Sequence, residues 1–321
     1  MKKKYLFFTF RIFCSFAFLY ALFHIVPYRG LVELWPRVRL SFAACSAAAF
    51  SAGLFLGIIR WKYIMHALQI PASGRETVSA YFSGLFLNLF FPSVLAGDMF
   101  RGFGITRRHR APRHVFSSLV MDRLSGLLAL NLVVAAAYFS AYATLARAQA
   151  VSLALSAITV LNVCIVSLVV SRTFFRFLLA LVGPVRRLRA RVVLLHRHLY
   201  YFRRHPLFFL YTLLFSLCIQ CMTAVSFYFA ARALGAQADL KIFLCLAPVI
   251  MLIAFIPVTI AGAGTREAAS VYFFSLFGIS EPVALGIALL NFFYLVTVGL
   301  AGGVVYVAFY HRWLQSHSRR Q

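Results

Sequence analysis

Long uninterrupted apolar stretches constrain this chain more than any other feature of its sequence. Several of them reach about 20 residues, the length that an α-helix needs to cross a hydrocarbon core roughly 30 Å thick. Hydrophobic residues make up 63% of the 321 residues and charged residues only 12%, whereas soluble domains are about half apolar and a quarter charged. We therefore expect a single all-α integral membrane domain over residues 1–321.

The apolar stretches predict about six spanning helices and two interrupted segments. The spanning helices are expected at 5–26, 40–59, 115–142, 151–170, 207–231 and 283–310. The first follows three lysines and has no small-residue cleavage site, so we expect it to be retained rather than removed as a signal peptide. The interrupted segments, 79–106 and 242–278, each contain an apolar arm, a Pro/Gly break and a second arm.

The formal net charge of +25 is distributed as in a membrane protein. Basic residues gather at the ends of apolar segments, as the positive-inside rule describes, so no nucleic-acid partner is expected. If both interrupted segments are re-entrant hairpins, the connectors on the side of the N-terminus hold 22 of the 32 Lys and Arg residues. If 79–106 were a single crossing, the basic run 107–110 would lie outside, against the rule.

This distribution favours re-entrant hairpins with both chain termini in the cytoplasm. The basic connector 172–206 would then also be cytoplasmic. Anionic lipid of the cytoplasmic leaflet is the expected partner for this positive charge.

The two breaks share a motif. Residues 92–101 and 257–266 both fit Pro-x-x-x-Ala-Gly-x-x-x-Arg. Because three expected spans separate them, two re-entrant segments would enter from opposite faces, as in an inverted repeat whose broken helices form a substrate site near the midplane. The simpler alternative is that these residues only kink helices for packing. The breaking positions are Pro92, Gly97, Pro257, Gly262 and Gly264.

Six charged residues lie in apolar surroundings, namely Asp98, Arg101, Asp122, Arg123, Arg266 and Glu267. A charged side chain at the bilayer centre costs about 2.5–3.5 kcal/mol, so these groups should pair or face water. Asp98 and Arg101 are spaced to share one helix face. Adjacent residues on a helix point about 100° apart, so Asp122 and Arg123 should have different partners, as should Arg266 and Glu267. We expect a network across several helices rather than three separate pairs.

This network has two interpretations, a structural one that fixes helix packing and a functional one that binds a polar lipid head group. A helix that begins after Gly97 or Gly262 would add free N–H groups and a positive dipole end. Arg101 or Arg266 beside it would be a candidate phosphate clamp, because arginine forms two parallel hydrogen bonds. Asn88, before the first break, can satisfy freed backbone groups or line the site. No catalytic residue, metal ligand or cofactor is predicted.

Three motifs, 88–101, 121–126 and 257–268, resemble in this order the flippase-like transmembrane region of lysylphosphatidylglycerol synthases and its stand-alone bacterial and archaeal relatives. The family usually has Glu where this chain has Asp98 and Asp122, and both changes keep the charge. The resemblance covers essentially the whole chain. It implies an inner-membrane protein that moves an aminoacylated phospholipid, another phospholipid or a glycolipid between leaflets.

Bifunctional members of that family carry a soluble aminoacyl-transferase domain after the membrane region. This chain ends at Gln321, soon after its last expected span, so we expect no lipid synthesis by the chain itself. The alternative function is a membrane subunit or scaffold for a separate lipid- or glycan-modifying enzyme, docked on the basic connector 172–206. An intramembrane enzyme is less favoured, because arginines beside the buried carboxylates would keep them ionised.

Overall fold

The computed structural model confirms the all-helical class. It describes residues 33–34, 36, 38–90, 94–146, 148–170, 206–256, 259 and 262–305, and no strand occurs among them. Four parts of the sequence prediction lie outside the described residues, namely the expected span 5–26, residues 172–205 of the basic connector, Pro92 and Pro257.

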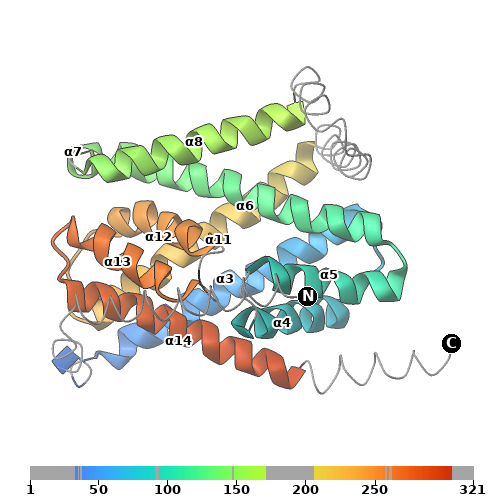
Figure 1. Cartoon of the computed structure of the whole chain (residues 1–321), viewed down its shortest axis with the longest axis horizontal. Coiled ribbons are helices and arrows are strands. Elements are labelled where there is room, and N and C mark those ends of the chain that lie inside the picture. Colours follow the sequence, from blue (N-terminus) through green and yellow to red (C-terminus); the bar gives the residue numbers. More distant parts are fainter. Residues whose placement is uncertain are drawn as a thin grey trace, which may run out of the picture.

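Ten helices follow one another in the part of the chain that the structure describes (Figure 1). They are α3 (Leu40–Ala67), α4 (Gly74–Phe90), α5 (Val94–His109), α6 (Pro112–Ser140), α7 (Tyr142–Leu145), α8 (Gln149–Val170), α11 (Pro206–Ala233), α12 (Leu240–Ala254), α13 (Thr265–Ser275) and α14 (Glu281–Val305).

Four of these helices, α3, α6, α11 and α14, are long and apolar enough to cross a membrane. They coincide with four of the expected spans, although α3 continues well past Ile59, where the sequence prediction ended it. The extension is helical because Trp61, Ile64 and Met65 bury an apolar face along it. Arg60 therefore lies inside a spanning helix and not in a connector.

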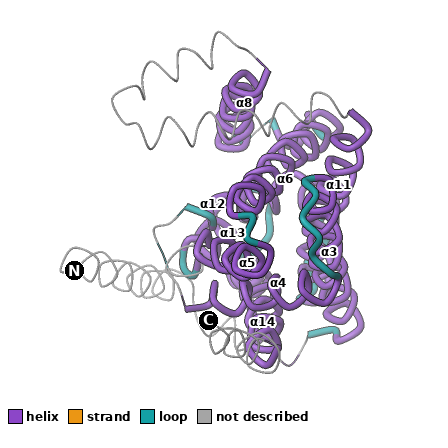
Figure 2. Tube along the Cα trace, turned by 90° about the vertical axis from the view of Figure 1, so that its right-hand side faces the viewer, coloured by secondary structure: helices purple, strands orange, loops and turns teal. Residues whose placement is uncertain are grey.

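A long–short–short–long order of helices occurs twice. The first group, α3 to α6, has lengths of 28, 17, 16 and 29 residues. The second group, α11 to α14, has lengths of 28, 15, 11 and 25 residues. Helix α8 lies outside both groups, beside α6 (Figures 1 and 2).

The two groups meet along α3 and α11, which pack side by side in antiparallel directions (Figures 1 and 2). Near the start of α3, the Phe42 ring stacks on Phe229 near the end of α11, with ring centroids 6.3 Å apart. Near the end of α3, Tyr63 stacks on Phe208 at the start of α11, with centroids 4.9 Å apart. The first helices of the two groups therefore run in opposite directions.

Helices α4 and α5 form an antiparallel hairpin whose outer ends lie together. Glu76, near the start of α4, pairs with Arg108 Nε at 2.5 Å and contacts His109 Nε2 at 3.2 Å, both near the end of α5. Burial alone would raise the pKa of Glu76, but a hydrogen bond from the Ser73 backbone, together with His109 and Arg108, lowers it below its usual value. Glu76 is therefore ionised at neutral pH and joins the two outer ends.

The tip of this hairpin depends on a close approach of backbones. The backbone N–H of Gly97 donates to Asn88 Oδ1 at 2.8 Å, so Asn88 satisfies a backbone group next to the first break, one of its two predicted roles. A Cβ on Gly97 would overlap the Gly84 carbonyl oxygen and the Asn88 side chain. Only glycine fits at this contact.

The second break contains two glycines in the left-handed region, Gly262 at φ +72° and Gly264 at φ +91°. A Cβ on Gly262 would lie 2.8 Å from the carbonyl oxygen of Ala254, the last residue of α12. Both breaks thus bring a glycine of the shared motif against the end of the preceding helix.

We predict that Gly97→Ala lowers the free energy of unfolding by about 1–3 kcal/mol, because overpacking forces backbones apart. Gly53→Ala in α3 is the matched control, since its Cβ would meet Met222 Cβ at an ordinary 3.4 Å. Thermal unfolding of both variants in detergent micelles measures the difference. Equal stability of the two variants would contradict the close approach at the hairpin tip.

Candidate functional site

Asp122 of α6 joins helices from two other parts of the chain. Its Oδ1 accepts from Arg60 Nε of α3 at 2.8 Å, and its Oδ2 accepts from Arg101 Nη2 of α5 at 2.8 Å. Arg60 Nη1 also donates to Ser216 Oγ of α11 at 2.8 Å. One carboxylate therefore holds two arginines, and four helices meet around it.

A second carboxylate extends this contact. Asp98 Oδ1 lies 3.1 Å from Arg101 Nη2, as the spacing of these two residues predicted. Asp98 Oδ2 accepts from Arg123 Nε at 2.6 Å and also from Arg123 Nη2. Asp122 and Arg123 have different partners, in agreement with the prediction.

The five side chains Arg60, Asp122, Arg101, Asp98 and Arg123 are linked in this order and are called the ion network below. Charges alternate along it, and each carboxylate lies between two arginines. Three arginines and two aspartates give the network a formal net charge of +1. The network confirms that most of the predicted intramembrane charges share partners across several helices.

Arg101 is the most enclosed cation of the network. Its guanidinium carbon lies 4.6 Å from the centroid of the Trp61 ring and 4.9 Å from that of Tyr81. Such cation–π contacts are strongest where water is excluded. Its Nε is buried and has no hydrogen-bond partner among the described residues.

Arg123 is the most exposed member of the network, with 34% of its side chain accessible against 13% for its partner Asp98. Its guanidinium carbon lies 4.8 Å from the centroid of the Phe255 ring. Phe255 directly follows α12, where the chain enters the second break. Arg123 therefore contacts both interrupted segments, one through Asp98 and the other through Phe255.

Arg266 and Glu267 do not follow the prediction that they would have different partners. Arg266 Nε donates to Glu267 Oε1 at 3.1 Å, and Arg266 Nη2 also contacts this oxygen. The prediction was wrong because the 100° rule describes Cβ directions, whereas an arginine side chain is long enough to fold back onto its neighbour. Within the described residues, no ion pair or hydrogen bond links this pair to the ion network.

Of the two helix starts considered from the sequence, after Gly97 or after Gly262, only the second agrees with the structure. Helix α5 begins at Val94, so Gly97 lies inside it, and its N–H is already bound by Asn88. Helix α13 begins at Thr265, and Glu267 accepts from the Gly264 N–H at 2.6 Å. Beside each break, a side chain of the protein thus accepts a hydrogen bond from a backbone N–H group.

Arg60 is the network member that the sequence prediction missed. The apolar stretch was ended at Ile59, so Arg60 was counted among the connector charges. Arg60, Ile64 and Leu68 recur every fourth residue and are all buried, so they lie on one helix face. In the sequence, the apolar residues Ile64 and Leu68 continue the helical period past Arg60, and this period was the available signal.

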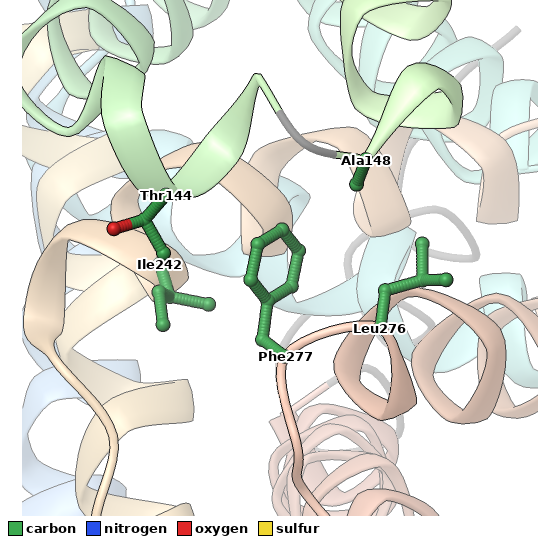
Figure 3. Close-up of a pocket in the computed structure, with 5 residues that line it drawn as sticks. All are labelled: Thr144, Ala148, Ile242, Leu276 and Phe277. Carbon is green, nitrogen blue, oxygen red and sulfur yellow. The ribbon is translucent and has the colours of Figure 1, made fainter.

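A separate cavity of about 310 Å³ lies where α12 begins and α13 ends. Its lining side chains are apolar except for one hydroxyl, and none of them belongs to the ion network (Figure 3). The lining residues are Thr144, Ala148, Ile242, Leu276 and Phe277. The side chains that line this cavity carry no charged group.

Comparison with known proteins identifies the family. The family model described as the lysylphosphatidylglycerol synthase TM region matches residues 8–303, whereas no curated protein and no solved structure matches the chain. The match covers most of the chain, so the chain belongs to this family, as its motifs indicated. Together with the four candidate spans, it identifies a multi-pass membrane protein with a lipid-related function.

We predict that Asp122→Asn lowers the free energy of unfolding by about 3–5 kcal/mol, because it leaves two buried arginines without this carboxylate. Adding Arg60→Gln should recover most of the loss, since a neutral amide pair replaces the broken ion pair. Glu281→Gln, at an exposed acid, should change stability by less than about 0.5 kcal/mol. Chemical unfolding in mixed micelles measures all three variants, and equal losses in the single and double variants would contradict the coupling.

Proposed function

We propose that this member of the lysylphosphatidylglycerol synthase transmembrane family moves a polar lipid between leaflets and holds the head-group phosphate at Arg123. One observation carries the proposal: a buried ion network of net charge +1 ends in an arginine that is 34% exposed. Arg101 is the second proposed phosphate contact. Asp98, which contacts both arginines, is proposed to hold them in place, whereas Asp122 is proposed to join α6 to α3 and α5.

The electrostatics of the network favour an anionic ligand. Charge without compensation is costly in a low-dielectric interior, and one phosphodiester anion would bring the network to neutrality. Arg123 uses Nε and Nη2 on Asp98, which leaves Nη1 for a phosphate oxygen. The buried Arg101 Nε adds a second unpaired donor within the described residues.

We further propose that the two helix groups form an inverted repeat and that both interrupted segments are re-entrant. The antiparallel packing of α3 and α11 supports this arrangement. The contacts between the two groups also support it. Helix α4 of the first group packs on α14, the last helix of the second group, and its counterpart α12 packs on α6, the last helix of the first group. In transporters built this way, the substrate site lies near the midplane where the broken helices meet.

The other predicted site residues are proposed to support this site from the two breaks. Asn88 shapes the tip of the first hairpin, and Arg266 with Glu267 shapes the start of α13. We propose an inner-membrane location with cytoplasmic termini. The basic run 107–110 at the outer end of the α4–α5 hairpin supports this orientation.

The proposal predicts that the purified protein accelerates exchange of a labelled phospholipid between leaflets of reconstituted vesicles. Arg123→Gln should slow this exchange at least about tenfold, since a hydrogen bond to a charged group contributes about 1.5–3 kcal/mol. The rate of quenching of a head-group fluorophore by an impermeant reductant measures it.

Arg75→Gln is the matched control, because Arg75 is an exposed arginine at the start of α4. This variant should exchange lipid at the wild-type rate. Exchange by the wild-type protein no faster than in protein-free vesicles would contradict the proposed function. A wild-type rate for Arg123→Gln would remove Arg123 from it.

A further inference from the structure

The two helix groups carry a polar contact at equivalent positions. Arg60 and Ser226 are each the twenty-first residue of their helix, α3 and α11, and Asp122 and Asn291 are each the eleventh residue of α6 and α14. Arg60 Nε donates to Asp122 Oδ1 at 2.8 Å, and Ser226 Oγ donates to Asn291 Oδ1 at 2.9 Å. The same position joins the two long helices of each group, with ions in the first and neutral side chains in the second.

The contact between Ser226 and Asn291 is formed by hydrogen bonds between uncharged groups. Asn291 Nδ2 donates to the Ile287 carbonyl oxygen at 3.1 Å, and Ser226 Oγ also lies 3.1 Å from the Ser46 carbonyl oxygen. Both Ser226 and Asn291 are buried. Joining the long helices at this position therefore requires hydrogen bonds but no ionised groups.

The contact between Asp98 and Arg123 has no charged equivalent in the second group. Arg123 is the twelfth residue of α6, and the twelfth residue of α14 is Phe292. The shared motif of the two breaks aligns Asp98 with Ala263. Phe292 instead lies under the Arg266 guanidinium, with 4.7 Å between the guanidinium carbon and the ring centroid.

We infer that Arg123, held by Asp98, determines the selection of an anionic head group, whereas the pair of Arg60 and Asp122 joins helices and can be replaced by a neutral pair. The inference rests on the proposed lipid movement. It assigns one anion-selective position to the protein, in the first helix group. Removing both Arg60 and Asp122 as charges leaves Arg101, Asp98 and Arg123, whose formal charge is still +1.

The test compares two labelled lipids in the same vesicles, phosphatidylglycerol with one phosphodiester and a glycosyl diacylglycerol without phosphate. The measured quantity is the exchange rate of phosphatidylglycerol divided by that of the glycosyl diacylglycerol, and this quotient is called the ratio below. Arg123→Gln should lower this ratio at least tenfold relative to the wild-type protein. The double variant Arg60→Gln/Asp122→Asn should keep the ratio within threefold of the wild type, and Arg123→Lys should restore part of it.

Three results would overturn the inference. The first is an unchanged ratio in Arg123→Gln. The second is a double variant whose ratio falls as far as that of Arg123→Gln. The third is a double variant that fails to fold while Arg123→Gln folds. Thermal unfolding of each variant in micelles separates the last result from the second. If the wild-type protein exchanges neither lipid, the proposed function fails, and with it the premise of this inference.

Discussion

Ionised side chains inside hydrocarbon must find partners within the protein, and the arrangement of this molecule follows from that constraint. A single charge at the bilayer centre is costly, and five charged side chains are linked here in one buried network. Its members come from α3, α5 and α6, with Ser216 of α11 hydrogen-bonded to Arg60. Segments far apart in the sequence are thereby fixed against one another at the same place.

The interrupted segments explain why this network can exist. The chain reverses direction at the break between α4 and α5. This hairpin places Asp98 and Arg101 in the protein interior. The break itself is compact because Gly97 approaches Gly84 and Asn88 closely. The second break reaches the network through Phe255, which lies under Arg123. Both interrupted segments therefore contact the same partly exposed guanidinium, that of Arg123.

The sequence was sufficient for the helical class, the family and four of the spans, because long apolar stretches and ordered motifs are local signals. It also predicted that Asp122 and Arg123 face different partners, since adjacent residues diverge on a helix. The same rule failed for Arg266 and Glu267, where the length of the arginine side chain decides the contact. Arg60 was missed because the charge was taken as the end of a span. Only tertiary packing reveals that Asp122 compensates it.

Asp98 and Arg123 meet in the protein interior, beside both breaks, and the proposed lipid site depends on this contact. An electron cryomicroscopy map of the protein in phosphatidylglycerol nanodiscs would resolve the two side chains. We expect continuous side-chain density between these two residues, with a lipid head group against the free edge of the guanidinium. Density that separates them, with Arg123 directed toward the acyl chains, would show that this contact does not form.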